Sequence, residues 1–133
     1  MDEFTRAYIE AALWSSNDES DESGGNPLDA NYGPDDIAPE TLESIKADCE
    51  RFQTENAILL EEFYDKLPLG RDRSGEWSPQ EQAGHDFWLS RNGHGAGFFD
   101  RDVTRELREA LQEKARQAGE VNLYVGDDGQ IWA

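Results

Sequence analysis

The sequence predicts an α+β fold in which three to four helices pack on a small antiparallel sheet of two hairpins. Two observations predict this fold. Apolar residues recur every three or four positions over 3–14, 39–66 and 101–118, which is the period of an amphipathic helix. Residues 85–100 and 120–132 instead place turn formers between short runs of aromatic and β-branched residues, which is typical of hairpins.

The first predicted helix spans residues 3–14, where Phe4 and Tyr8 begin an apolar stripe. An acidic, serine-rich and glycine-rich segment follows, and its low complexity predicts a flexible loop at about 15–26. The turn formers after this loop surround apolar residues such as Leu28. We therefore expect the stretch that precedes the second helix to be held against the core.

The longest predicted helix spans residues 39–66, with Pro39 at its first position. Its apolar face is a heptad seam of Leu42, Ile45, Cys49, Phe52, Asn56, Leu59 and Phe63. The polar member, Asn56, leaves two interpretations open. A seam asparagine can fix the register of a coiled-coil pair, which would make the protein a homodimer, or it can be a polar residue in helix packing within one chain.

A short helix is predicted over 78–84, after a connector at 67–79. Ser78 and Glu81 have the spacing of a capping box, and Pro79 suits the first helical position. We expect this helix to end at Gly84.

The next segment, 85–100, is predicted to be a hairpin because Asn92-Gly93 lies between two aromatic runs. The alternative is a helix that continues through Leu89 and ends at Asn92-Gly93. A last helix over 101–118 is followed by Gly119, a residue typical of helix ends, and by the closing hairpin at 120–132.

Charge is the strongest functional signal in the chain. Thirty acidic residues face twelve basic ones in 133 residues, a formal net charge of −18. Residues 1–70 hold eighteen of the acids and four of the bases, so most of the excess lies in that half. Such a chain repels nucleic acid and anionic membranes and attracts cationic surfaces. We therefore expect neither direct nucleic-acid binding nor membrane binding.

Length and cysteine content limit the other classes. The chain has the length of a single domain, which we expect to span residues 1–133. Cys49 is the lone cysteine, so neither an intrachain disulfide nor a cysteine-rich zinc site can form. The start of the chain lacks the pattern of a signal peptide, and no apolar run is long enough for a membrane span, so a cytoplasmic location is expected. No cofactor or metal is predicted.

The acidic residues of the long helix and of the loop before it lead to the first functional hypothesis. A helix with carboxylates on successive turns can imitate part of a row of phosphates. The protein would then be a non-enzymatic DNA mimic that binds the cationic nucleic-acid site of another protein. The predicted contacts are Asp18, Glu19, Asp21, Glu22, Glu43, Glu50, Glu55, Glu61, Glu62 and Asp65.

A second hypothesis attributes no partner to the charge. Acidic surfaces also maintain solubility and are general in salt-adapted proteins. On this interpretation the protein is a small structural or adaptor protein that forms a homodimer through the seam.

A third hypothesis concerns a polar cluster in the segment 85–94. Two imidazoles and a carboxylate could bind a ligand or a metal, or serve acid–base chemistry. The cluster consists of His85, Asp86, Arg91, Asn92 and His94. Its spacing matches no standard metal site, so ordinary turn and capping roles are the favoured interpretation, and no catalytic residue is assigned.

Several segments resemble a family of uncharacterised small acidic proteins from bacteriophages and mobile elements. The resemblance is carried by residues 85–101 and by 8–16, 36–42 and 121–129, which together make up 42 of the 133 residues and are spread along the chain. It implies a phage-encoded modulator of a host machine, such as an anti-restriction or anti-defence inhibitor in the host cytoplasm. It supplies no catalytic residues.

Overall fold

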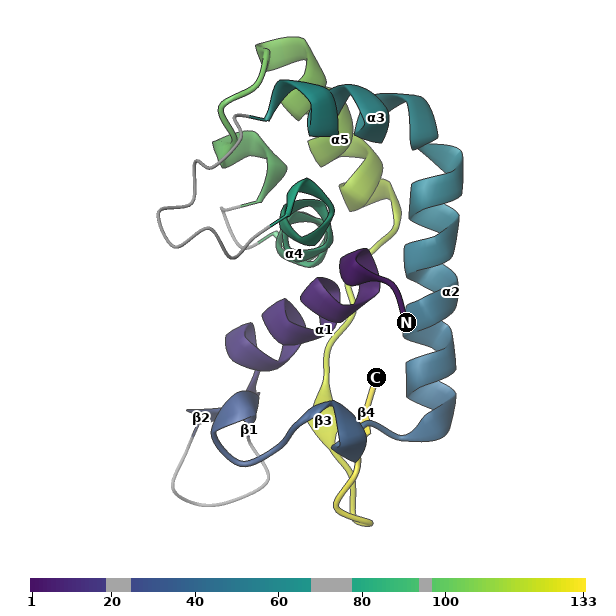
Figure 1. Ribbon diagram of the computed structural model, residues 1–133. Coiled ribbons are helices and arrows are strands. Elements are labelled where there is room, and N and C mark those ends of the chain that lie inside the picture. The colour runs from purple at the N-terminus through teal and green to yellow at the C-terminus, as the bar shows by residue number, and fades with distance from the viewer. Residues whose placement is uncertain (19–24, 68–77, 94–96) are drawn as a thin grey trace.

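The computed structural model describes residues 1–18, 25–67, 78–93 and 97–133 (Figure 1). Five α-helices lie in these residues: α1 (Glu3–Ser15), α2 (Pro39–Glu55), α3 (Ala57–Lys66), α4 (Pro79–Arg91) and α5 (Arg105–Gln117). Short 3₁₀ helices cover Leu28–Ala30, Pro34–Asp36 and Phe98–Asp100. The α+β class is confirmed in outline, but the chain is more helical than the sequence predicts.

Two small antiparallel strand pairs complete the described fold. β1 (Asn17–Asp18) pairs with β2 (Asn26–Pro27), and β3 (Tyr124–Val125) pairs with β4 (Ile131–Trp132). The second pair confirms the closing hairpin. β1 and β2 flank residues 19–24, so half of the loop predicted at about 15–26 lies outside the described residues.

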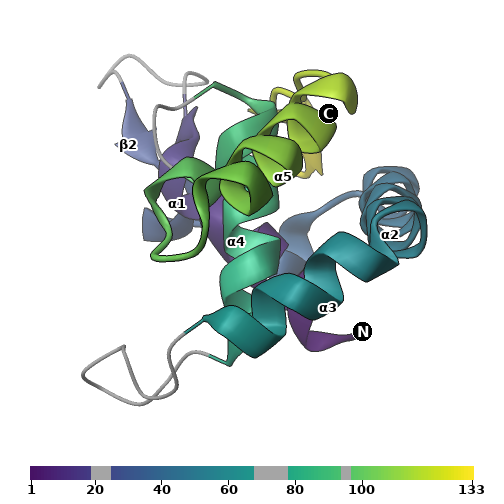
Figure 2. The ribbon, with the colours of Figure 1, turned by 90° about the horizontal axis from the view of Figure 1, so that it is seen from above.

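The predicted helix over 39–66 is two helices, because the chain bends at Asn56. Its φ of −117° and ψ of 27° are not helical, and its Nδ2 donates to the carbonyl of Phe52 at 2.9 Å. An asparagine side chain that bonds the backbone in this way competes with the helical hydrogen-bond ladder. In Figure 2, α2 is seen nearly along its axis, whereas α3 runs across the view.

The heptad seam is used within the chain. Ile45, Cys49, Phe52, Asn56 and Phe63 are all buried, and the apolar ones belong to the core. A homodimer would therefore need a surface other than this seam.

The hairpin predicted at 85–100 is wrong, and the alternative helix is correct. The capping box forms as predicted, with Ser78 N donating to Glu81 Oε1 at 2.8 Å and Glu81 N to Ser78 Oγ at 3.1 Å. The helix then continues past Gly84 to Arg91. Gly84 lies inside the helix, against the backbone of Phe4, where a Cβ atom would collide with the Phe4 carbonyl. The glycine is therefore needed for the close approach of α1 and does not mark a helix end.

The core is centred on α1 and α4, which pack against each other through this close approach. Aromatic rings join α1, α2 and α4. Phe52 of α2 stacks on Phe87 of α4 with the ring centroids 4.1 Å apart, and the ring centroid of Tyr8 on α1 lies 5.4 Å from those of Phe87 and Trp88. Such ring pairs add about 0.5–1.5 kcal/mol beyond the area they bury. These aromatics therefore hold α1 and α2 against the C-terminal half of α4.

Among the described residues, no helix combines the length and the apolar character that crossing a membrane requires.

Candidate functional site

The acidic side chains of α2 and α3 lie on the surface. The six predicted contacts from these helices are all exposed: Glu43, Glu50, Glu55, Glu61, Glu62 and Asp65. Glu19, Asp21 and Glu22 lie outside the described residues, as does the side chain of Asp18. The structure thus describes the helical part of the predicted surface.

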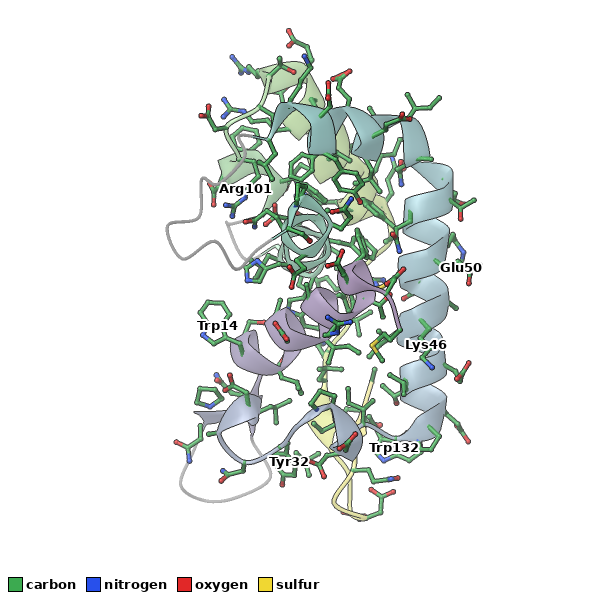
Figure 3. All side chains as sticks on the ribbon, viewed as in Figure 1. Trp14, Tyr32, Lys46, Glu50, Arg101 and Trp132 are labelled. Atoms are coloured by element: carbon green, nitrogen blue, oxygen red, sulfur yellow. The ribbon has the colours of Figure 1, made fainter. Side chains whose placement is uncertain are left out.

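The acids of α2 are partly neutralised. Glu43 and Glu50 are seven residues apart, which places them about 10 Å apart along one side of the helix, and Figure 3 shows Glu50 directed away from the other helices. Lys46 lies between them, with its Nζ 3.8 Å from Glu43 Oε1. Exposed pairs of this kind contribute about 0–1 kcal/mol, but this one reduces the negative charge of the α2 surface.

The outer face of α3 is more uniformly negative. Glu61, Glu62, Tyr64 and Asp65 line a shallow hollow of about 750 Å³ together with Ile58, which is 84% exposed. None of the three carboxylates forms an ion pair within the described part of the chain. We call Glu61, Glu62 and Asp65 the acidic face.

Glu55 lies apart from this face. It lines a cleft of about 450 Å³ between α2, α4 and α5, together with Arg51, Arg91 and Lys114. The single rod of carboxylates expected from one long helix is therefore absent, because the bend at Asn56 divides the acids into separate groups.

Arg91 has a structural role that its place in the predicted cluster did not indicate. Its Nη1 donates to Tyr8 Oη and to Asp48 Oδ2, both at 3.0 Å. Its Nε and Nη2 donate to the carbonyls of Gly119 and Ala118 at 2.7 and 2.9 Å, and its guanidinium lies 5.1 Å from the centroid of the Phe87 ring. This one side chain ties α1, α2 and the end of α5 to α4.

His85 and Asp86 lie elsewhere on α4. His85 and Arg91 are six positions apart, which is about 9 Å along the helix axis. The carboxylate of Asp86 is fully buried, with Oδ2 3.0 Å from Arg101 Nε and Oδ1 3.7 Å from His85 Nδ1. Trp14, whose ring centroid is 6.4 Å from that of His85, projects outward at the end of α1 (Figure 3).

The predicted polar cluster is therefore not assembled into one site by the described residues. Asn92 Oδ1 accepts a hydrogen bond from Val121 N at 2.8 Å, which holds the segment after α5. His94 lies outside the described residues. No group of three or more metal-ligating side chains occurs in residues 1–18, 25–67, 78–93 and 97–133.

Burial decides which titratable groups are shifted. It raises the pKa of the Cys49 thiol to about 12 and that of Tyr64 to about 12, and it also raises the pKa of Tyr8. A thiolate is the reactive form of cysteine. Cys49 is therefore a protonated core residue at neutral pH, as its place on the apolar seam predicts.

Sequence reasoning missed the cleft and the hydrophobic centre of the α3 face. The cleft joins residues more than fifty positions apart, and no local pattern signals such a meeting. Ile58 directly precedes the seam residue Leu59 and does not belong to the seam, and this position could have indicated that its side chain is exposed.

Comparison with known proteins gives no relative. No protein-family model matches the chain, and neither a curated protein nor a solved structure matches it. The resemblance to small phage-type proteins stays a prediction.

Proposed function

We propose that this protein is a non-enzymatic binding protein whose acidic face docks on the cationic nucleic-acid site of another protein. The observation that carries the proposal is the outer face of α3. Three exposed carboxylates there form no ion pair within the described residues, although the same chain pairs acids with bases elsewhere. Unpaired surface carboxylates keep their field available to a cationic partner.

The shape of α3 also favours a protein partner over simple hydration. Ile58 is an exposed apolar side chain that lines the same hollow as the three carboxylates. Protein interfaces combine a small apolar centre with a polar rim. A helix that only needed solubility would gain nothing from an isoleucine there, although single exposed apolar residues are common.

The first test is capture of host proteins by the tagged chain at low and at high salt. The proposal predicts a DNA- or RNA-processing protein that is captured at low salt, released at high salt and displaced by duplex DNA. Electrostatic attraction between exposed charges is screened within about 8 Å at physiological ionic strength, so its loss at high salt follows directly.

A partner that resists both salt and DNA would contradict the proposal. It would favour the adaptor hypothesis, in which the acidity serves solubility or salt adaptation. Self-association as the sole result would favour a homodimer that forms through a surface other than the buried seam.

A further inference from the structure

The cleft between α2, α4 and α5 has the size of a small-molecule site. Its volume of about 450 Å³ lies within the usual range for ligand pockets, roughly 300–1,000 Å³. Its base includes Phe52 and Phe87, which are stacked on each other and buried. Charged side chains from α2 and α5 form its rim.

Part of the charge in this cleft is satisfied within the fold. Arg91 and Asp48 form an ion pair at 3.0 Å, and Arg91 makes four hydrogen bonds in all. These two groups therefore belong to the structure of the cleft wall. What a ligand would meet is the remaining set of charges.

Three charged groups remain at the rim. Lys114 and Glu55 are exposed and form no ion pair within the described chain. Arg51 has a side chain that is 65% exposed, and its Nη1 is 3.9 Å from Asp48 Oδ1, which is a weak contact. The rim thus offers two cations and one anion.

Asn56 adds an unsatisfied acceptor to the cleft wall. The residue is only 5% exposed, and its Nδ2 bonds the Phe52 carbonyl. Its Oδ1 accepts no hydrogen bond from the described residues, and it is not one of the fully enclosed atoms that lack a partner. The oxygen is thus accessible, and because Asn56 lines the cleft, a ligand there can supply the donor that the protein does not.

We propose that this cleft binds an acidic α-amino acid. Arg51 and Lys114 would each hold one carboxylate, and the ammonium group would donate to Glu55 and to Asn56 Oδ1. The methylene groups would lie over the apolar base. This site is separate from the acidic face on α3 and does not depend on the function proposed for it.

The charge pattern selects this class of ligand among small molecules. A dicarboxylate without an ammonium group would leave Glu55 and the Asn56 oxygen unpaired, whereas a basic amino acid would bring a second cation to Arg51 and Lys114. An unpaired polar group in a partly enclosed site costs affinity. We therefore expect both to bind at least about tenfold more weakly than glutamate.

The experiment is an NMR titration of the ¹⁵N-labelled protein with glutamate, aspartate, glutarate, lysine and inorganic phosphate. Glutamate or aspartate should shift the backbone amides around Asn56, Arg91 and Lys114. Lys114→Gln and Glu55→Gln should each weaken binding at least about tenfold. Arg105→Gln makes the same charge change as Lys114→Gln on the exposed side of α5 and should leave binding unchanged.

Three results would overturn the proposal. Glutamate and aspartate could give no saturable shifts in the cleft. Glutarate or phosphate could bind as well as glutamate, which would show general anion binding. Lys114→Gln could bind no more weakly than Arg105→Gln. All three variants change exposed side chains, and we therefore expect each to fold. A spectrum like that of the wild type in the absence of ligand confirms it.

Discussion

Around α4 the charged side chains are buried and paired, whereas on the outer face of α3 they are exposed and unpaired. Asp86 and Arg91 lie in the core region and each has a partner of opposite charge at 3.0 Å. Glu61, Glu62 and Asp65 have none within the described residues. Removal of one partner of a buried pair strands the other charge, but removal of a free surface charge strands nothing. The first group should thus determine stability, and the second should determine interaction.

The largest expected effect is at Arg91. Arg91→Met would leave the Asp48 carboxylate without its closest cation and remove the bonds to Tyr8 and to the end of α5. Asp48 is itself 30% exposed and can regain water, so most of the loss comes from the acceptors on Tyr8, Ala118 and Gly119, each of which costs about 1–3 kcal/mol if it stays buried without its donor. Urea denaturation measures this loss of unfolding free energy. Arg105→Met, which breaks an exposed pair on α5, should cost no more than about 0.5 kcal/mol.

Asp86→Asn tests the second buried pair. The amide keeps the shape of the side chain but leaves Arg101 without its anion. Arg101 is itself partly exposed and can regain water, so we expect a smaller loss of about 2–3 kcal/mol. Equal unfolding free energies for this variant and the wild type would show that the pair is not structural.

Neutralisation of the acidic face should not lower the unfolding free energy as the two substitutions around α4 do. Glu61→Gln, Glu62→Gln and Asp65→Asn together change the net charge from −18 to −15. Because these groups repel one another and have no cationic partner, unfolding free energy should stay within about 1 kcal/mol of the wild type or rise. A loss of several kcal/mol in thermal or urea denaturation would mean that these carboxylates are structural.

The smallest effect is expected in acid, at Asp2. Burial raises the pKa of this carboxyl, but hydrogen bonds from Thr5 and Gln53 outweigh it and lower the pKa overall. A lowered folded-state pKa contributes stability that is present above the unfolded value, near 4, and is lost as the pH falls through the folded value. Asp2→Asn should remove a small part of the acid sensitivity of unfolding below about pH 4. An unchanged pH profile would show that the hydrogen bonds to the Asp2 carboxyl do not contribute to stability.

Much of the helical structure could be predicted from the sequence because its signals are local. The stripe at Phe4 and Tyr8, the capping box at Ser78 and the turn before Ile131 each act over a few residues, and each is present in the structure. Two predictions were wrong, the hairpin at 85–100 and the end of the preceding helix at Gly84, because tertiary contacts outweighed the local signals. Asn-Gly at 92–93 can end a helix as well as close a hairpin, and contact of α1 at Gly84 favours the helix.

The candidate sites were less predictable than the fold. Exposure of the predicted acidic contacts follows from their positions opposite the seam, and it is confirmed for the six of them that lie on α2 and α3. Their division into separate groups depends on the bend at Asn56, which the heptad spacing conceals. The role of Arg91 depends on contacts with Tyr8, Asp48 and Gly119, which are distant in sequence.

The acidic face can be separated from net charge by the salt dependence of affinity for the captured partner, compared between two variants of equal net charge. One variant carries the three substitutions of the acidic face. The other carries Glu10→Gln, Glu106→Gln and Glu113→Gln, all at exposed positions outside α2 and α3. We expect the first to lose affinity and to give a shallower slope against salt, while the second follows the wild type. Equal behaviour of the two variants would contradict the account, because it would mean that net charge, and not the face on α3, drives binding.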